Sequence, residues 1–230
     1  MIFSILGMNL TMAEALLALV AIVLIYLISL TFHEWAHSFV AYKQGDMTPK
    51  FAGRLSFNPS KHLDFWGFIC FLVAGIGWAK PVPINPINFK KYRTGIARVS
   101  IAGVGANAIL MVLSSFMYVM LNTVVGKINL FMDFLILFFY WSMQINAFLI
   151  VFNLLPIYPL DGFNFISSYL PSNSKFIDYN VRNGYKIFIW IIFIDLFLEM
   201  LIGISIIAFV LGNLSYYLYR PLEMLWGLIF

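Results

Sequence analysis

The chain has 230 residues, of which 62% are hydrophobic and only 10% are charged, and its mean hydropathy is +0.91. Soluble domains carry about 25% charged residues, so the composition excludes a soluble globular protein and indicates an integral membrane protein. The formal net charge of +4 comes from basic residues that flank apolar segments. Because topology signals have this pattern, the charge predicts a lipid bilayer and no nucleic acid as partner.

The first apolar segment, residues 13–42, is long enough to cross a membrane as a helix, but it contains His33, Glu34 and His37 in the pattern HEWAH. Ionisable side chains at that depth cost about 3 kcal/mol or more unless they are paired, solvated or bound. Two histidines four positions apart lie on one helix face and can both turn a ring nitrogen toward one metal ion. Glu34 can then reach a water on that metal, which is the working geometry of H-E-x-x-H zinc proteases.

A second apolar stretch, residues 64–79, lies between two loops that are rich in lysine and arginine. The positive-inside rule predicts that both loops are cytoplasmic. A segment below the spanning length with both flanks on one side is predicted to be re-entrant rather than a crossing.

Residues 80–98 are predicted to be an extended cytoplasmic loop, because the three prolines in KPVPINPINF exclude a helix. The alternating positions Val82 and Ile84, with Asn85, predict a short membrane-associated edge strand. Such a strand could bind an unwound peptide by strand addition. An ordinary extended linker is the alternative interpretation.

Three further apolar segments, residues 97–125, 130–154 and 185–212, are predicted to be transmembrane helices. The tail, residues 213–230, is rich in tyrosine and tryptophan and is expected at the membrane–water interface. The expected fold is therefore a single integral membrane domain: an all-α polytopic bundle with a re-entrant segment and a short β element.

A catalytic zinc usually has three protein ligands and an open position. Of the possible third ligands, His62 lies in a loop where SKHLD suggests an interfacial position, which makes it a poor candidate. Two prolines in NLLPIYPLDGF, residues 153–163, break the helix predicted at 130–154 and leave Asp161 on irregular backbone. Irregular backbone at membrane depth persists only where it is buried in protein or lines a wet cavity, so Asp161 is the better candidate.

HEWAH on one membrane helix, followed by NLLPIYPLDG on a later one, resembles the site-2 protease family of intramembrane zinc metalloproteases. The intervening GRLSFNPSKHLD and GWAKPVPINPINF resemble the short prokaryotic branch of that family that lacks a PDZ domain. The resemblance implies one catalytic Zn²⁺ and a set of site residues. These are His33, His37 and Asp161 as zinc ligands, Glu34 as general base, and Asn153 and Asn107 as residues that orient the substrate or stabilise the oxyanion.

The role of Asn107 stays open at this point. Family members often have a Gly-Pro-x-x-Asn element, whereas this chain reads GVGAN with Val104 in place of the proline. A helix-interface amide is an equally good interpretation of Asn107.

The resemblance implies a regulated intramembrane endopeptidase that cuts in or near the transmembrane helix of another membrane protein. It also implies a prokaryotic membrane, and the basic loops that follow the helix of His33 and His37 place the active site toward its cytoplasmic side. Two alternatives remain: a CAAX-type membrane zinc protease that uses Glu199, one turn after Asp195, as third ligand, or a non-enzymatic zinc transporter or scaffold.

The ligand set makes a topological demand of its own. For Asp161 to meet both histidines, the segments 13–42 and 130–154 must run in the same direction across the membrane and 97–125 must run in the opposite one. Segment 64–79 then cannot cross, which agrees with the distribution of basic residues.

Overall fold

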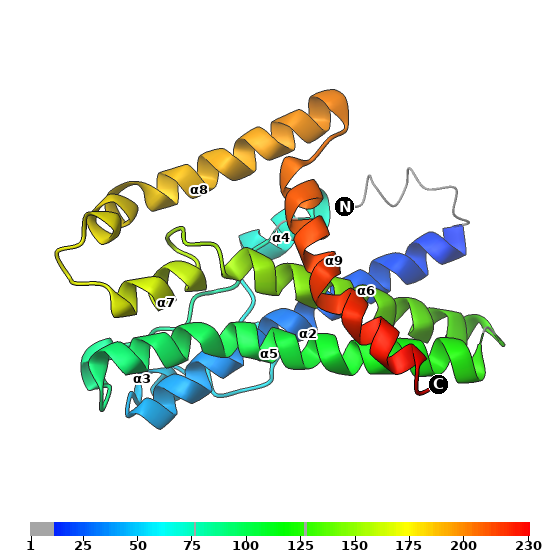
Figure 1. Ribbon diagram of the computed structural model, residues 1–230, viewed down its shortest axis with the longest axis horizontal. Coiled ribbons are helices and arrows are strands. Elements are labelled where there is room, and N and C mark those ends of the chain that lie inside the picture. The colour runs from blue at the N-terminus through cyan, green and yellow to red at the C-terminus, as the bar shows by residue number, and fades with distance from the viewer. Residues whose placement is uncertain (1–11, 76, 127) are drawn as a thin grey trace.

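The computed structural model describes residues 12–75, 77–126 and 128–230, and these residues are mostly helical (Figure 1). The long helices are α2 (Met12–Gln44), α5 (Tyr92–Met120), α6 (Leu130–Asn153), α8 (Lys175–Ile202) and α9 (Ile206–Gly227). Three short helices connect them: α3 (Thr48–Phe51), α4 (Phe65–Ala74) and α7 (Asp161–Tyr169). Two 3-10 turns, Pro59–Lys61 and Pro86–Asn88, and a π-helical turn, Leu121–Val125, complete the described elements.

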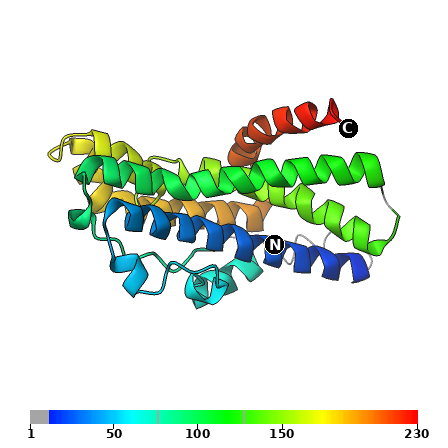
Figure 2. The ribbon, with the colours of Figure 1, turned by 90° about the horizontal axis from the view of Figure 1, so that it is seen from below.

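Helices α2, α5 and α6 form an elongated bundle in which α5 packs against both of the others (Figures 1 and 2). Among the described residues, three stretches are long and apolar enough to cross a membrane: Glu14–Gln44, Tyr92–Val125 and Leu130–Asn153. The bent pair α8 and α9 is a fourth if it is counted as one span. In Figure 1, α2 and α6 run in one direction and α5 runs in the opposite one, as the ligand set demands. The predicted all-α integral membrane bundle is confirmed.

Helix α2 shows how the sequence separates lipid from protein. Large apolar side chains recur every four residues on an exposed face, at Leu16, Val20 and Leu24. The small residues Ala18 and Ala21 are buried on the other side. Small side chains let membrane helices approach closely, while exposed leucine and valine suit a lipid environment.

Helix α4 is the segment predicted to be re-entrant. The Asp64 carboxylate accepts a hydrogen bond of 2.8 Å from the Gly67 N–H at the start of the helix, and Gly75 ends it with a left-handed backbone (φ 79°). A helix of 10 residues rises only about 15 Å, half of the hydrocarbon thickness. It is therefore too short to cross.

Residues 80–98 contain no strand, contrary to the expected β element; one isolated antiparallel bridge in the described chain joins Leu63 to Ala79, just before this segment. The chain stays extended up to Asn85 but makes no strand, because the prolines remove backbone donors and no second strand lies alongside. The Arg54 guanidinium holds this segment by donating to the carbonyl oxygens of Lys80 (2.9 Å) and Pro81 (3.0 Å). Helix α5 also begins five residues earlier than the predicted start at 97, at Tyr92.

The prediction of one helix over residues 185–212 is wrong. Helix α8 ends at Ile202, the next residue Gly203 has a left-handed backbone (φ 71°), and α9 runs at an angle of 103° to α8. The buried Asp195 stabilises this break: its carboxylate accepts from the Ser205 hydroxyl (2.6 Å) and the Ile207 N–H (2.8 Å) at the start of α9. Most of the predicted interfacial tail, 213–230, belongs to α9, and its position at the interface stays a prediction.

Asp46 fastens the end of α2 to the extended segment before α5. Its fully buried carboxylate accepts hydrogen bonds from the backbone and hydroxyl of Thr48, the Asn85 N–H and the Asn88 amide. Burial raises the pKa of Asp46, but these hydrogen bonds outweigh burial and lower the pKa below its ordinary value. The ionised carboxylate is therefore the form that stabilises the fold.

We expect Asp46→Ala to destabilise the protein at pH 7 by about 3 kcal/mol, because several hydrogen bonds to a charged acceptor are lost. The pKa of Asp46 is lower in the folded protein, so its contribution is complete above the unfolded value of about 3.9 and is lost as the pH falls through the folded value. In detergent, the thermal unfolding temperature of the wild type should therefore exceed that of the variant at pH 7, and this difference should shrink below pH 4. The matched control is Asp178→Ala, which removes only an exposed ion pair with Arg182; an equal loss in the control would contradict the prediction.

Candidate metal centre

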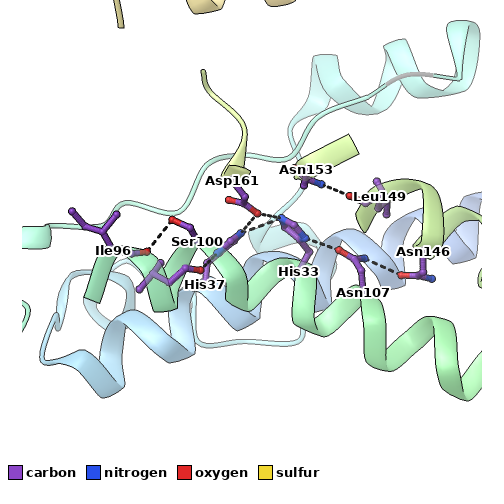
Figure 3. A network of polar contacts seen from close by, with 10 residues as sticks. His33, His37, Ile96, Ser100, Asn107, Asn146, Leu149, Asn153 and Asp161 are labelled. Atoms are coloured by element: carbon purple, nitrogen blue, oxygen red, sulfur yellow. Dashed lines mark hydrogen bonds and ion pairs between the residues drawn. The ribbon is translucent and has the colours of Figure 1, made fainter. Parts of the chain in front are cut away.

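Three side chains from two distant parts of the chain converge at one point (Figure 3). His33 and His37 lie one turn apart on α2, and Asp161 is the first residue of α7. The two Nε2 atoms are 3.0 Å apart, and each lies 3.3 Å from Oδ2 of Asp161. Within the part of the chain that the structure describes, this is the group of histidine, cysteine and carboxylate side chains that could hold a metal ion.

The hydrogen bonds of the two Nδ1 atoms fix the direction in which the two Nε2 atoms point. Nδ1 of His37 lies 2.7 Å from the carbonyl oxygen of Val99, and Nδ1 of His33 lies 2.6 Å from Oδ1 of Asn107. Because an oxygen of this kind only accepts, both Nδ1 atoms carry the proton. Both Nε2 atoms therefore direct a lone pair toward the Asp161 carboxylate.

Three lone-pair atoms that face one another repel unless a cation or a proton lies between them. Oδ2 of Asp161 is buried without a hydrogen-bond donor among the described residues. Tetrahedral zinc with bonds of about 2.0–2.1 Å places its ligand atoms about 3.3 Å apart, which matches the separations of 3.0, 3.3 and 3.3 Å. The three residues thus fit one face of a zinc tetrahedron and leave its fourth position open.

Asp161 reaches this point because two glycines allow close contacts. A Cβ on Gly162 would overlap the carbonyl of Leu154, so only glycine lets the start of α7 lie against the end of α6. A Cβ on Gly103 would lie 2.5 Å from Cε1 of His33 and 2.5 Å from Nε2 of His37, so α5 needs glycine opposite the two rings. Sequence reasoning missed Gly103, although its position one turn before Asn107 places both residues on one face of α5.

The remaining predicted residues lie around the triangle. Glu34 is half-buried next to His33 on α2, and no hydrogen bond or ion pair of its carboxylate is found within the described ranges. Asn153, at the end of α6, donates one amide hydrogen to the Leu149 carbonyl (3.0 Å), a contact drawn in Figure 3. Asn107 is fully buried, and both ends of its amide are hydrogen-bonded.

The geometry does not support the alternative in which Glu199 is the third ligand. Glu199 is exposed near the end of α8, and Asp195, one turn before it, is engaged at the start of α9. His62 is fully buried, its Nε2 lies 2.7 Å from the carbonyl oxygen of Ser56, and its position at the membrane interface stays a prediction.

The extended segment of residues 80–85 lies beside the metal-binding group. Ile84 packs against a buried cluster that includes Ala41, one turn after His37, and Val99, whose carbonyl contacts the His37 ring. The backbone groups of Val82 and Ile84 make no hydrogen bond within the described residues. Asn85 differs, because its N–H donates to Asp46 and its carbonyl accepts from the Asn88 N–H.

Comparison with known proteins agrees with this chemistry. The model of a family described as "Peptidase family M50" matches residues 20–194. A protein of Bacillus subtilis (strain 168), named "Putative zinc metalloprotease YwhC", is 45% identical over 151 residues, which are 65% of this chain and 69% of the Bacillus protein. No solved structure matches the chain.

We expect Gly103→Ala to reduce the zinc content of the purified protein at least tenfold, because the new methyl group would overlap both metal-binding ring nitrogens. Gly105→Ala is the matched control, since a Cβ there meets nothing within 4 Å. Both changes replace glycine within the same helix and favour helix formation equally. Elemental analysis after metal loading checks the expectation, and equal zinc content in the two variants would contradict it.

Proposed function

Because the chain belongs to peptidase family M50, the site-2 protease family, we propose that its metal centre hydrolyses a peptide bond in or near the transmembrane helix of another membrane protein. The observation that carries the proposal is the meeting of two imidazoles and one carboxylate at the ligand spacing of tetrahedral zinc, on helices long enough to span a membrane. The family supports the enzyme class, a zinc metalloprotease embedded in the bilayer, over the transporter or scaffold alternative.

In this proposal His33, His37 and Asp161 hold one zinc ion, which supplies the Lewis acidity that activates water and polarises a carbonyl. Glu34 accepts the proton of the attacking water and passes it to the leaving amine. Its position next to a ligand, with a carboxylate free of other partners in the described chain, supports this role. Asn153 has a second amide hydrogen that can be donated to the oxygen that gains negative charge.

A transmembrane substrate has to unwind before it can be cut, because an intact helix satisfies its own backbone hydrogen bonds. The extended segment can bind the unwound stretch by strand addition through the free backbone groups of Val82 and Ile84. Asn85, predicted as a third contact, instead ends the segment, since its backbone groups are engaged within the loop.

We place the active site toward the cytoplasmic side of a prokaryotic cell membrane. His37 lies seven positions before the end of α2 at Gln44, or about 10 Å along the helix axis. Basic residues gather at this end of the bundle, with Lys43 on α2 and Lys90 and Lys91 before α5. The positive-inside rule assigns that end to the cytoplasm.

Substitutions at Glu34 and Asp161 separate catalysis from metal binding. We expect Glu34→Gln to keep its zinc and to cleave a model transmembrane peptide about 10²–10⁴ times more slowly, because only the proton acceptor is lost. Asp161→Ala should lose both zinc and cleavage, because the two remaining imidazoles are one ligand short of the three that a catalytic zinc usually has. Zinc content and cleavage in detergent micelles are measured on the same samples, with Glu199→Ala as control. Zinc retained in Asp161→Ala but lost in Glu199→Ala would contradict the ligand assignment.

The strand-addition step is tested at Val82. Val82→Pro removes one backbone donor from a segment that is already extended, so we expect the KM for a peptide substrate to rise about 2–10-fold, the value of one hydrogen bond. Val82→Ala keeps the donor and controls for the side chain. Zinc content should be unchanged in both variants. Equal KM values would show that the Val82 N–H does not bind the substrate.

A further inference from the structure

A chain of hydrogen bonds leads from His33 away from the metal centre into the interface between α5 and α6 (Figure 3). Nδ1 of His33 lies 2.6 Å from Oδ1 of Asn107. The amide nitrogen of Asn107 donates to Oδ1 of Asn146 at 2.8 Å, and the amide nitrogen of Asn146 donates to the backbone carbonyl of Ser142 at 2.8 Å. Asn107 and Asn146 are both fully buried.

The far end of this chain fixes the direction of every bond in it. A backbone carbonyl only accepts, so Asn146 must turn its NH₂ group toward Ser142 and its oxygen toward Asn107. Asn107 then has to turn its NH₂ group toward Asn146 and its oxygen toward His33. His33 consequently carries its proton on Nδ1 and keeps Nε2 free to bind a metal.

The second histidine reaches the same state by a shorter route. His37 donates directly to the backbone carbonyl of Val99, which cannot rotate. The amide of Asn107 can turn over, because its oxygen and nitrogen ends have nearly the same shape. Asn107 alone therefore does not determine the tautomer of His33; it needs a neighbour that distinguishes its two ends.

Building on the proposed zinc protease, we propose that Asn146 is a positioning residue of the metal centre, which acts through Asn107 to hold His33 in its zinc-binding tautomer and orientation. Asn146 does not touch the metal-binding atoms. Removal of its oxygen would leave the buried NH₂ group of Asn107 without an acceptor and would let the amide turn its donors toward His33. A donor there favours the proton on Nε2, where it blocks the metal.

The alternative interpretation is that Asn146 has only a structural role and joins α5 to α6 through polar contacts. The same interface offers a control for it: the hydroxyl groups of Ser114 and Ser142 make a buried hydrogen bond of 2.8 Å between these two helices. Ser142→Ala removes that bond but keeps the backbone carbonyl of residue 142, which is the main acceptor for Asn146 at 2.8 Å. The Ser142 hydroxyl is only a second and more distant partner of Asn146, at 3.4 Å.

The experiment measures Zn²⁺ affinity of the full chain in detergent by competition with a chelator. We expect Asn146→Leu to weaken Zn²⁺ binding about tenfold, the lower end of the 10–100-fold range for partners of metal ligands. Asn146→Asp keeps an oxygen for Asn107 and a similar volume, so it should stay within about threefold of wild type. Ser142→Ala should stay within about twofold. Affinity unchanged in Asn146→Leu, equal losses in Asn146→Leu and Asn146→Asp, or an equal loss in Ser142→Ala would each overturn the proposal.

A double-mutant cycle tests the route through Asn107. If Asn146 acts only on Asn107, then Asn146→Leu should change Zn²⁺ affinity less than about twofold when Asn107→Leu is already present. Fully additive losses would overturn the proposal.

The tautomer itself is visible without metal and without catalysis. The chain has only 3 histidines, so selective ¹⁵N labelling of histidine gives three rings, with His62 as internal reference. In metal-free protein we expect the His33 signals to move from the Nδ1–H toward the Nε2–H pattern in Asn146→Leu and to stay in place in Ser142→Ala. Unchanged His33 signals in Asn146→Leu would overturn the proposal. A wild-type protein that binds Zn²⁺ but cleaves no peptide would instead contradict the proposed function and leave these measurements meaningful.

Discussion

The structure depends on the close approach of three electron-pair donors, two imidazole nitrogens and one carboxylate oxygen, that repel one another unless a cation joins them. The fold holds them together against this repulsion. The helices α2 and α6 run in the same direction, so that Asp161, which follows α6, reaches His33 and His37 on α2. Gly103 and Gly162 remove the side-chain volume that would keep α5 and α7 away. Bringing these groups together costs free energy that metal binding can return.

Sequence reasoning identified the parts that short-range chemistry determines. Histidines four apart on a helix and a carboxylate just beyond a proline-broken helix belong to local patterns, and the structure brings their ligand atoms together. The direction of the spans also followed from sequence, because basic residues and the ligand set imposed the same topology. Gly103 and Asn146 were missed because their importance depends on what faces them from another helix.

The break between α8 and α9 was missed for a related reason. Residues 185–212 are mostly apolar, so composition favours one helix, and a glycine inside a long apolar run is no clear stop signal. What ends α8 is the combination of Gly203 with the Asp195 carboxylate from two turns earlier, which accepts from the Ser205 hydroxyl and from the Ile207 N–H at the start of α9. This contact forms only when the chain is already bent, so the sequence pattern alone does not indicate it.

The proline spacing of the extended segment also limits what can join it. In extended backbone, the groups of Val82 and Ile84 point to the same side, whereas Pro81 and Pro83 have no N–H to offer on the other. The segment can therefore accept a neighbour along one edge only, and the pair so formed cannot grow into a wider sheet on the proline side. The surface proposed to hold an unwound peptide is in this way protected from pairing with further copies of itself, a hazard that open strand edges otherwise carry.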